Sequence, residues 1–184
     1  QKREVAPAQG SAGTPMPVRL IPEIVEGSSG YLLEVGAQRW WVRPQVDLGP
    51  SDGVQFACRP DFLLVPVRKA EQRRSIAVFA DGWAFHKHCL REDARKRSAL
   101  VASERHWVWS VTWEDVQQVF DGNLDTDHVL NREARLDPGH PVPTKLSSVL
   151  GVPPALSDRG AISGLLTILG MEGDTADLVM ARRA

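Results

Sequence analysis

A strand–helix–strand–helix pattern in the middle of the chain constrains the fold more than any other feature. The run IAVFA is almost continuously apolar, which is typical of a central strand covered on both faces. HCLREDARKRSALVAS follows with helical periodicity, and HWVWSV is again a strand pattern. The next segment, TWEDVQQVF, is a helix pattern. Its first residue, Thr112, and Asp115 three positions later have the spacing of a capping box. A helix between two strands of one sheet implies a right-handed crossover. The pattern therefore predicts parallel pairing of residues 76–80 with residues 106–111.

Two further strand signals precede this unit. YLLEVG and RWWVRPQVDL are separated by a short polar turn at Ala37-Gln38, which predicts a hairpin. After the turn cluster GPSDG, the run VQFACRPDFLLVPV predicts a strand that is interrupted by Pro60 or begins there, and RKAEQRRS predicts a charged turn. Together these elements predict an α/β fold with a mixed central β-sheet flanked by helices. Trp107 and Trp109 alternate with Val108, so we expect both indoles on one face of their strand, in the core.

Composition limits the class of protein. A formal net charge of −1 argues against a generally basic nucleic-acid binder but leaves room for a local basic patch. The two cysteines, Cys58 and Cys89, form no disulfide framework, so we expect free thiols in a reducing cytosol and a cytoplasmic protein. No apolar run approaches the roughly 20 residues that a membrane-spanning helix needs, so we expect no membrane partner.

The chain divides into three predicted parts. Residues 1–17 are rich in Ala, Gly, Pro and Gln and indicate a flexible linker. Residues 18–121 hold the strand and helix signals. Residues 122–184 form an acidic, turn-rich tail with short helix candidates, LSSVLG and AISGLLTILG, which we expect to pack on the domain or on a neighbouring one. The chain begins without methionine and ends in LVMARRA, from which we expect a domain of a larger protein.

Four segments in order carry a family resemblance: RPQVDLG, RPDFLLVP, IAVFADGWAFH and DARKRSALVASERHWVWSVTWEDV. They resemble the PD-(D/E)XK restriction-endonuclease-like superfamily, and within it the branch of the very-short-patch-repair endonuclease. A looser likeness is to nuclease-like segments of bacterial helicases in phage-defence systems. The resemblance implies a restriction-endonuclease-like fold, a hydrolase activity on DNA, and neighbouring domains such as a helicase in a larger parent chain.

The same resemblance implies the site residues. Asp61 matches the metal-binding aspartate of the family, Asp81 matches the aspartate of its Asp-Gly pair, and His86 matches the histidine that follows. Gln45 matches a glutamine that often precedes this strand. The chain departs from the family at Phe79, where an acidic residue is usual.

Phosphodiester hydrolysis explains why these residue types matter. Asp61 and Asp81 offer hard oxygen ligands to Mg²⁺ or Mn²⁺, which neutralises the phosphate and lowers the pKa of an attacking water. His86 can act as general acid or base because the usual pKa of imidazole is near neutrality. The alternative is that Asp81-Gly82 is an ordinary turn after a strand.

Basic side chains gather in and around the predicted helix: Lys87, Arg91, Arg95, Lys96, Arg97 and Arg105. Such a surface can contact phosphates, although a solvated helix face is the alternative. We expect Lys87, Arg91 and Arg95 to bind nucleic acid, with Trp83 beside them. The leading hypothesis is a metal-dependent DNA endonuclease or a nuclease-derived module. The alternatives are an inactive nuclease fold for nucleic-acid binding or domain docking, and a protein scaffold.

Overall fold

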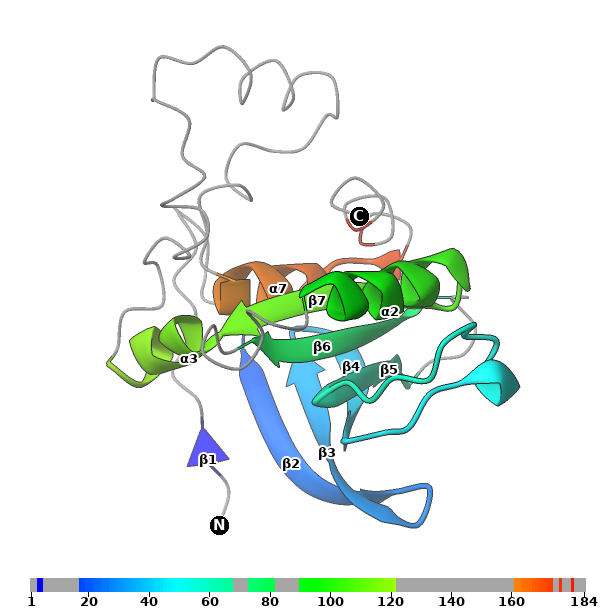
Figure 1. Cartoon of the computed structure of the whole chain (residues 1–184). Coiled ribbons are helices and arrows are strands. Elements are labelled where there is room, and N and C mark those ends of the chain that lie inside the picture. The colour runs from blue at the N-terminus through cyan, green and yellow to red at the C-terminus, as the bar shows by residue number, and fades with distance from the viewer. Residues whose placement is uncertain are drawn as a thin grey trace.

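The computed structural model describes residues 3–4, 17–67, 73–81, 90–121 and 161–173, together with residues 176 and 180, and every structural statement below concerns these residues. Its elements, labelled in Figure 1, are β1 (Arg3–Glu4), β2 (Val18–Val25), β3 (Ser28–Val35), β4 (Gln38–Pro44), η1 (Pro50–Asp52), β5 (Phe62–Pro66), β6 (Ser75–Asp81), α2 (Leu90–Ala102), β7 (His106–Thr112), α3 (Trp113–Phe120) and α7 (Ala161–Gly170). None of the described helices is long and apolar enough to span a membrane.

The seven strands form one sheet in sequence order. Neighbours from β1 to β6 are antiparallel, and β7 pairs with β6 in parallel, with Ile76 opposite Trp107. The predicted α/β class, mixed sheet and parallel pairing are therefore confirmed. The helix between the two parallel strands is α2, as expected from the crossover pattern.

Two tight hairpins join β2, β3 and β4 within the antiparallel part of the sheet. The predicted hairpin is confirmed as β3–β4, with its turn one residue earlier, at Gly36 and Ala37. The preceding hairpin, β2–β3, was not predicted. It turns at Glu26 and Gly27, which both have positive φ angles, 50° and 79°, as a two-residue hairpin turn requires.

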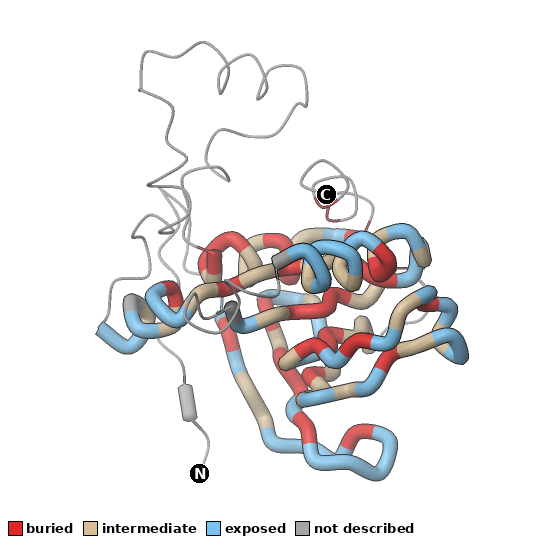
Figure 2. Tube along the Cα trace, viewed as in Figure 1, coloured by how far each residue is buried: buried red, intermediate tan, exposed pale blue. Residues whose placement is uncertain are grey.

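Both faces of the central strands are covered, as the apolar run IAVFA predicts. Ile76 and Val78 of β6 belong to a core shared with α7, whereas Ala77 packs in a second core with Leu100 of α2. The alternation of strand side chains thus separates an α7 side from an α2 side of the sheet. In Figure 1, α2 lies in front of β6 and β7 and α7 lies behind them. Figure 2 shows buried positions gathering along β6, β7 and α7.

Two indoles and one guanidinium attach α7 to the sheet. Trp109 donates its Nε1–H to the carbonyl of Ala161 at 3.1 Å, and Trp40 donates to the carbonyl of Leu169 at 3.0 Å. The guanidinium of Arg73 lies 4.5 Å from the Trp40 ring centroid and contacts the Ile168 carbonyl at 3.5 Å. Ile168 and Leu169 lie in the last turn of α7, where carbonyls lack partners further along the helix, and the donors of Arg73 and Trp40 bond to them. The predicted helix AISGLLTILG is confirmed and packs on this sheet. The other tail candidate, LSSVLG, lies outside the described residues.

A capping box begins α3, as the sequence predicts. Thr112 donates its backbone N–H to Asp115 Oδ2 at 2.6 Å, and Asp115 donates its own to Thr112 Oγ1 at 3.2 Å. These bonds satisfy backbone donors at the first turn of the helix. They also fix where β7 ends, at the same end of the sheet as Asp81, with which Thr112 pairs.

Candidate functional site

The side chain of Asp61 connects β5 to the end of β6. Its Oδ2 accepts the backbone N–H of Ala80 at 2.8 Å, and its Oδ1 accepts Nε2–H of Gln45 at 3.0 Å. The ladder between the two strands ends where Phe62 pairs with Val78. The Asp61 carboxylate therefore extends the pairing of β5 and β6 by a side-chain bond, and it lies next to the residue that precedes Asp81.

Gln45 holds Asp61 from the other side. The backbone of Gln45 has a φ of 52°, in the left-handed region that non-glycine residues seldom adopt. Three bonds keep it there: its N–H donates to the Asp61 carbonyl at 3.0 Å, its amide donates to the Asp61 carboxylate, and its carbonyl accepts Nε–H of Arg59 at 3.1 Å. Unusual backbone geometry that is held by several contacts is concentrated at functional sites. Gln45 therefore positions the Asp61 carboxylate.

Phe79 occupies the position where the resemblance implies an acidic residue. It packs, half-buried, with the α2-side core and pairs with Ser110 of β7. The guanidinium of Arg97 from α2 lies 5.0 Å from the centre of its ring, within the range of a cation–π contact. An aromatic ring covered by an arginine therefore occupies this position of β6, one residue before Ala80, whose N–H the Asp61 carboxylate accepts.

Only one of the other predicted residues of the metal site, Asp81, belongs to the described part of the chain. Asp81 is the last residue of β6, and the direction of its side chain is not described. His86, Trp83 and Lys87 lie outside the described residues. The structure thus places the carboxylate of Asp61 beside the end of β6, and the joint site with Asp81 and His86 stays a prediction. In the described part of the chain, no group of three or more His, Cys, Asp or Glu side chains could hold a metal ion.

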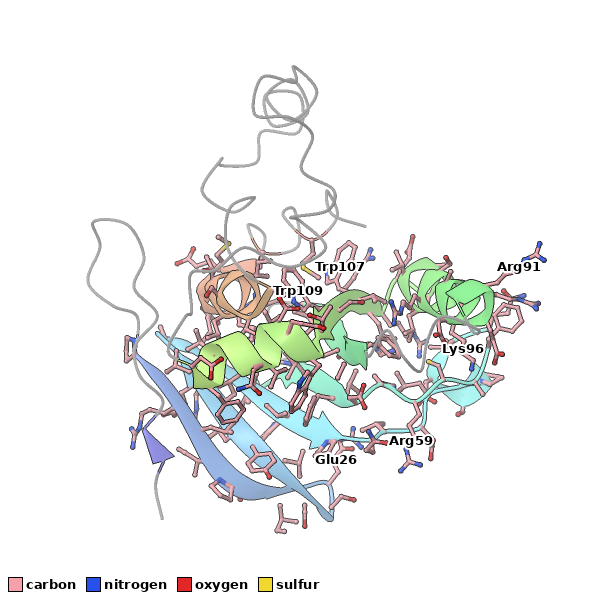
Figure 3. The ribbon with its side chains drawn as sticks, turned by 60° about the vertical axis from the view of Figure 1, so that its left-hand side comes forward. Glu26, Arg59, Arg91, Lys96, Trp107 and Trp109 are labelled. Atoms are coloured by element: carbon pink, nitrogen blue, oxygen red, sulfur yellow. The ribbon has the colours of Figure 1, made fainter. Side chains whose placement is uncertain are left out.

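Fewer basic side chains of α2 are exposed and available to a ligand than the sequence indicates. Arg91 is exposed and extends outward from the helix in Figure 3. Arg95 is also exposed, but its guanidinium lies 3.9 Å from the centre of the Phe56 ring. Lys96 forms an ion pair with Glu92 at 2.6 Å, one helical turn earlier. Arg91 and Arg95 are therefore the two described residues of α2 that offer exposed positive charge.

Trp107 and Trp109 do not contribute to an exposed binding surface. Both indoles belong to the α7-side core, and Figure 3 shows them between α7 and β7. The prediction that they lie in the core, on one face of their strand, is confirmed.

Two buried polar groups lie near the α2-side core. Burial raises the pKa of the Cys58 thiol, and the nearby Lys96 ammonium opposes this shift. Burial lowers the pKa of His106, with Asp52 opposing the shift and Arg105 adding to it. Neither ring nitrogen of His106 has a hydrogen-bond partner among the described residues. Cys58 is thus a poor nucleophile, and His106 is neutral at neutral pH.

The contacts that shape the site come from residues far apart in the chain. Arg59, which holds Gln45, and Arg97, which covers Phe79, were not predicted in these roles, because a sequence pattern carries no signal for pairing across a loop or between a helix and a strand. Gln45 was identified through the resemblance. Comparison with protein-family models, with curated proteins and with solved structures found no match. The family likeness therefore stays a prediction.

Proposed function

We propose that this chain is a restriction-endonuclease-like module that hydrolyses phosphodiester bonds in DNA with the help of Mg²⁺ or Mn²⁺. The observation that supports this proposal is the position of the Asp61 carboxylate, 2.8 Å from the backbone nitrogen of Ala80. Ala80 precedes Asp81, so the two aspartates named by the family resemblance belong to adjoining strand ends.

Asp61 is suited to hold a divalent ion. An ionised carboxylate offers about four lone-pair positions, and the two bonds to Gln45 and Ala80 use two of them. The residue is only partly buried, so a hydrated ion can reach it. A bound metal would neutralise phosphate charge and lower the pKa of a bound water. Asp81 is the second proposed ligand, and His86 is the proposed acid or base.

The exposed charges of α2 provide a surface for the DNA backbone. Arg91 and Arg95 stand on the helix that follows the strand of the proposed site. Contacts between cationic side chains and phosphates position a nucleic acid without reading its sequence. Lys87 and Trp83 are proposed to extend this surface. A helicase-containing parent chain and a cytoplasmic location remain part of the same proposal.

A second candidate function is an inactive nuclease fold that binds nucleic acid or docks against other domains. The observation that favours it is Phe79, whose ring lies beneath the Arg97 guanidinium at the position where the family carries an acid. Loss of that ligand weakens metal binding, whereas the basic surface of α2 is independent of it.

Nicking of supercoiled plasmid DNA with Mg²⁺ or Mn²⁺ separates the two functions. The test compares the unchanged chain, Asp61→Asn, and the control Asp47→Asn, whose side chain is 85% exposed on the same loop. Nicking that is lost only in Asp61→Asn supports the enzyme, and nicking that persists in Asp61→Asn contradicts it. If no variant nicks DNA, salt-dependent DNA binding that Arg91→Glu weakens identifies the second function.

A further inference from the structure

The α7 side of the sheet carries an exposed apolar corner. Ile24, Tyr31 and Phe62 are 66%, 36% and 41% exposed. Tyr31 pairs with Val42 and Phe62 pairs with Val78, and both valines belong to the α7-side core, so the two aromatic residues lie on that face. Ile24 shares the face because it follows the partner of Tyr31 by two residues. We call these three residues the open corner.

The path of α7 explains why this corner is exposed. The helix begins at the Trp109 indole on β7 and ends at the Trp40 indole on β4. Trp109 stands in one cross-strand row with Val78 and Phe62. Trp40 pairs with Pro66, at the opposite end of β5 from Phe62. α7 therefore crosses the sheet obliquely and leaves the residues at the start of β5 and beside it uncovered.

The chain itself supplies a candidate occupant for the open corner. It leaves α3 at Asp121 and returns at Ala161, and α3 packs against both α7 and β7. Both neighbours of residues 122–160 in the chain are thus held on the α7 side. Ala161, which follows this stretch, bonds to Trp109, and Trp109 lies in the cross-strand row that runs through Val78 to Phe62. Within this stretch, residues 145–157 read KLSSVLGVPPALS. Leu146, Val149 and Leu150 follow the three- and four-residue spacing of one apolar helix face.

We propose that residues 145–157 bind to the open corner, with Leu146, Val149 and Leu150 packing against Ile24, Tyr31 and Phe62. An exposed apolar face of a sheet normally marks an interaction site, and the tethered segment reaches this one at high effective concentration. The contact would complete the α7-side core. The inference does not depend on the proposed nuclease function.

A peptide-binding experiment tests this contact. In one variant of the full chain, residues 145–157 are replaced by a Gly/Ser sequence of equal length, and a fluorescent peptide of sequence KLSSVLGVPPALS is added. We expect the peptide to bind the replaced chain and not the unchanged chain. Adding Phe62→Ser should weaken binding by about tenfold, as loss of one large apolar contact implies. The control is Ile21→Ser, because Ile21 lies on β2 but on the opposite face, where it pairs with Leu32. Absence of binding, or equal weakening by both substitutions, overturns the proposal.

A second measurement keeps the proposal testable if the replaced chain does not fold. In the unchanged chain, hydrogen exchange of the amides in residues 145–157 should become faster with Phe62→Ser and stay the same with Ile21→Ser. Exchange that does not respond to Phe62→Ser contradicts the proposal. Concentration-dependent dimerisation that Phe62→Ser abolishes also overturns it, because a second copy then covers the open corner.

Discussion

Substitution of Asp61 separates its structural bonds from its proposed role as a metal ligand. Asp61→Ala removes both acceptors, so the N–H of Ala80 loses its partner. A hydrogen bond to a charged group contributes about 1.5–3 kcal/mol, but water can reach both donors here, which reduces the loss. We therefore expect Asp61→Ala to lower the free energy of unfolding by about 1–2 kcal/mol.

Asp61→Asn keeps a carbonyl oxygen for Ala80, and the Gln45 amide can turn to present its own oxygen to the new NH₂ group. We expect this variant to lose less than about 1 kcal/mol, while it removes the negative charge that a divalent ion needs. Urea unfolding, followed by tryptophan fluorescence, gives both values. Equal destabilisation by Asn and Ala would refute this reasoning, because the charge itself would then hold the end of β6. No loss with Ala would show that the two bonds contribute nothing to stability.

Three further predictions test other parts of the structure. Trp40→Phe leaves the buried carbonyl of Leu169 without its indole donor. We expect urea unfolding to show a free energy of unfolding that is lower by about 2–4 kcal/mol, and a loss below about 1 kcal/mol contradicts the attachment of α7. His106 has a folded-state pKa below its usual value of 6.5, so the unfolded state binds the proton first and stability falls as the pH drops through 6.5. His106→Leu should flatten the pH dependence of urea unfolding between pH 7 and 5 (roughly the imidazole range), and an unchanged slope counts against this account. Phe79→Glu should raise Mn²⁺ affinity in a calorimetric titration, with Arg97 as a partner for the new carboxylate; unchanged affinity argues against a nuclease-type site.

The elements that could be predicted from sequence are those whose signals are local. The pattern around α2 and β7 and the Thr112–Asp115 capping box involve residues a few positions apart, so periodicity and capping identify them. β2 was missed because Pro22 and Glu23 interrupt its strand pattern. Pro22 is tolerated in a strand whose outer neighbour, β1, pairs only near Leu20.

The attachment of α7 and the candidate site were harder to predict because their contacts are tertiary. The indole of Trp40 reaches a carbonyl 129 residues away, and no local pattern signals that bond. The resemblance named Asp61 and Gln45, but only the structure brings the two side chains together and attaches Asp61 to Ala80. In the same way, the missing acid at Phe79 is visible in the sequence, whereas the arginine that covers its ring is not.

A calorimetric titration with Mn²⁺ tests the proposed metal site most directly. The samples are the unchanged chain, Asp61→Asn, and Asp47→Asn as the control on the same loop. We predict binding to a single site in the unchanged chain and in Asp47→Asn, and its loss in Asp61→Asn. No binding to the unchanged chain, or equal binding to Asp61→Asn, would contradict the proposal that Asp61 holds a catalytic metal.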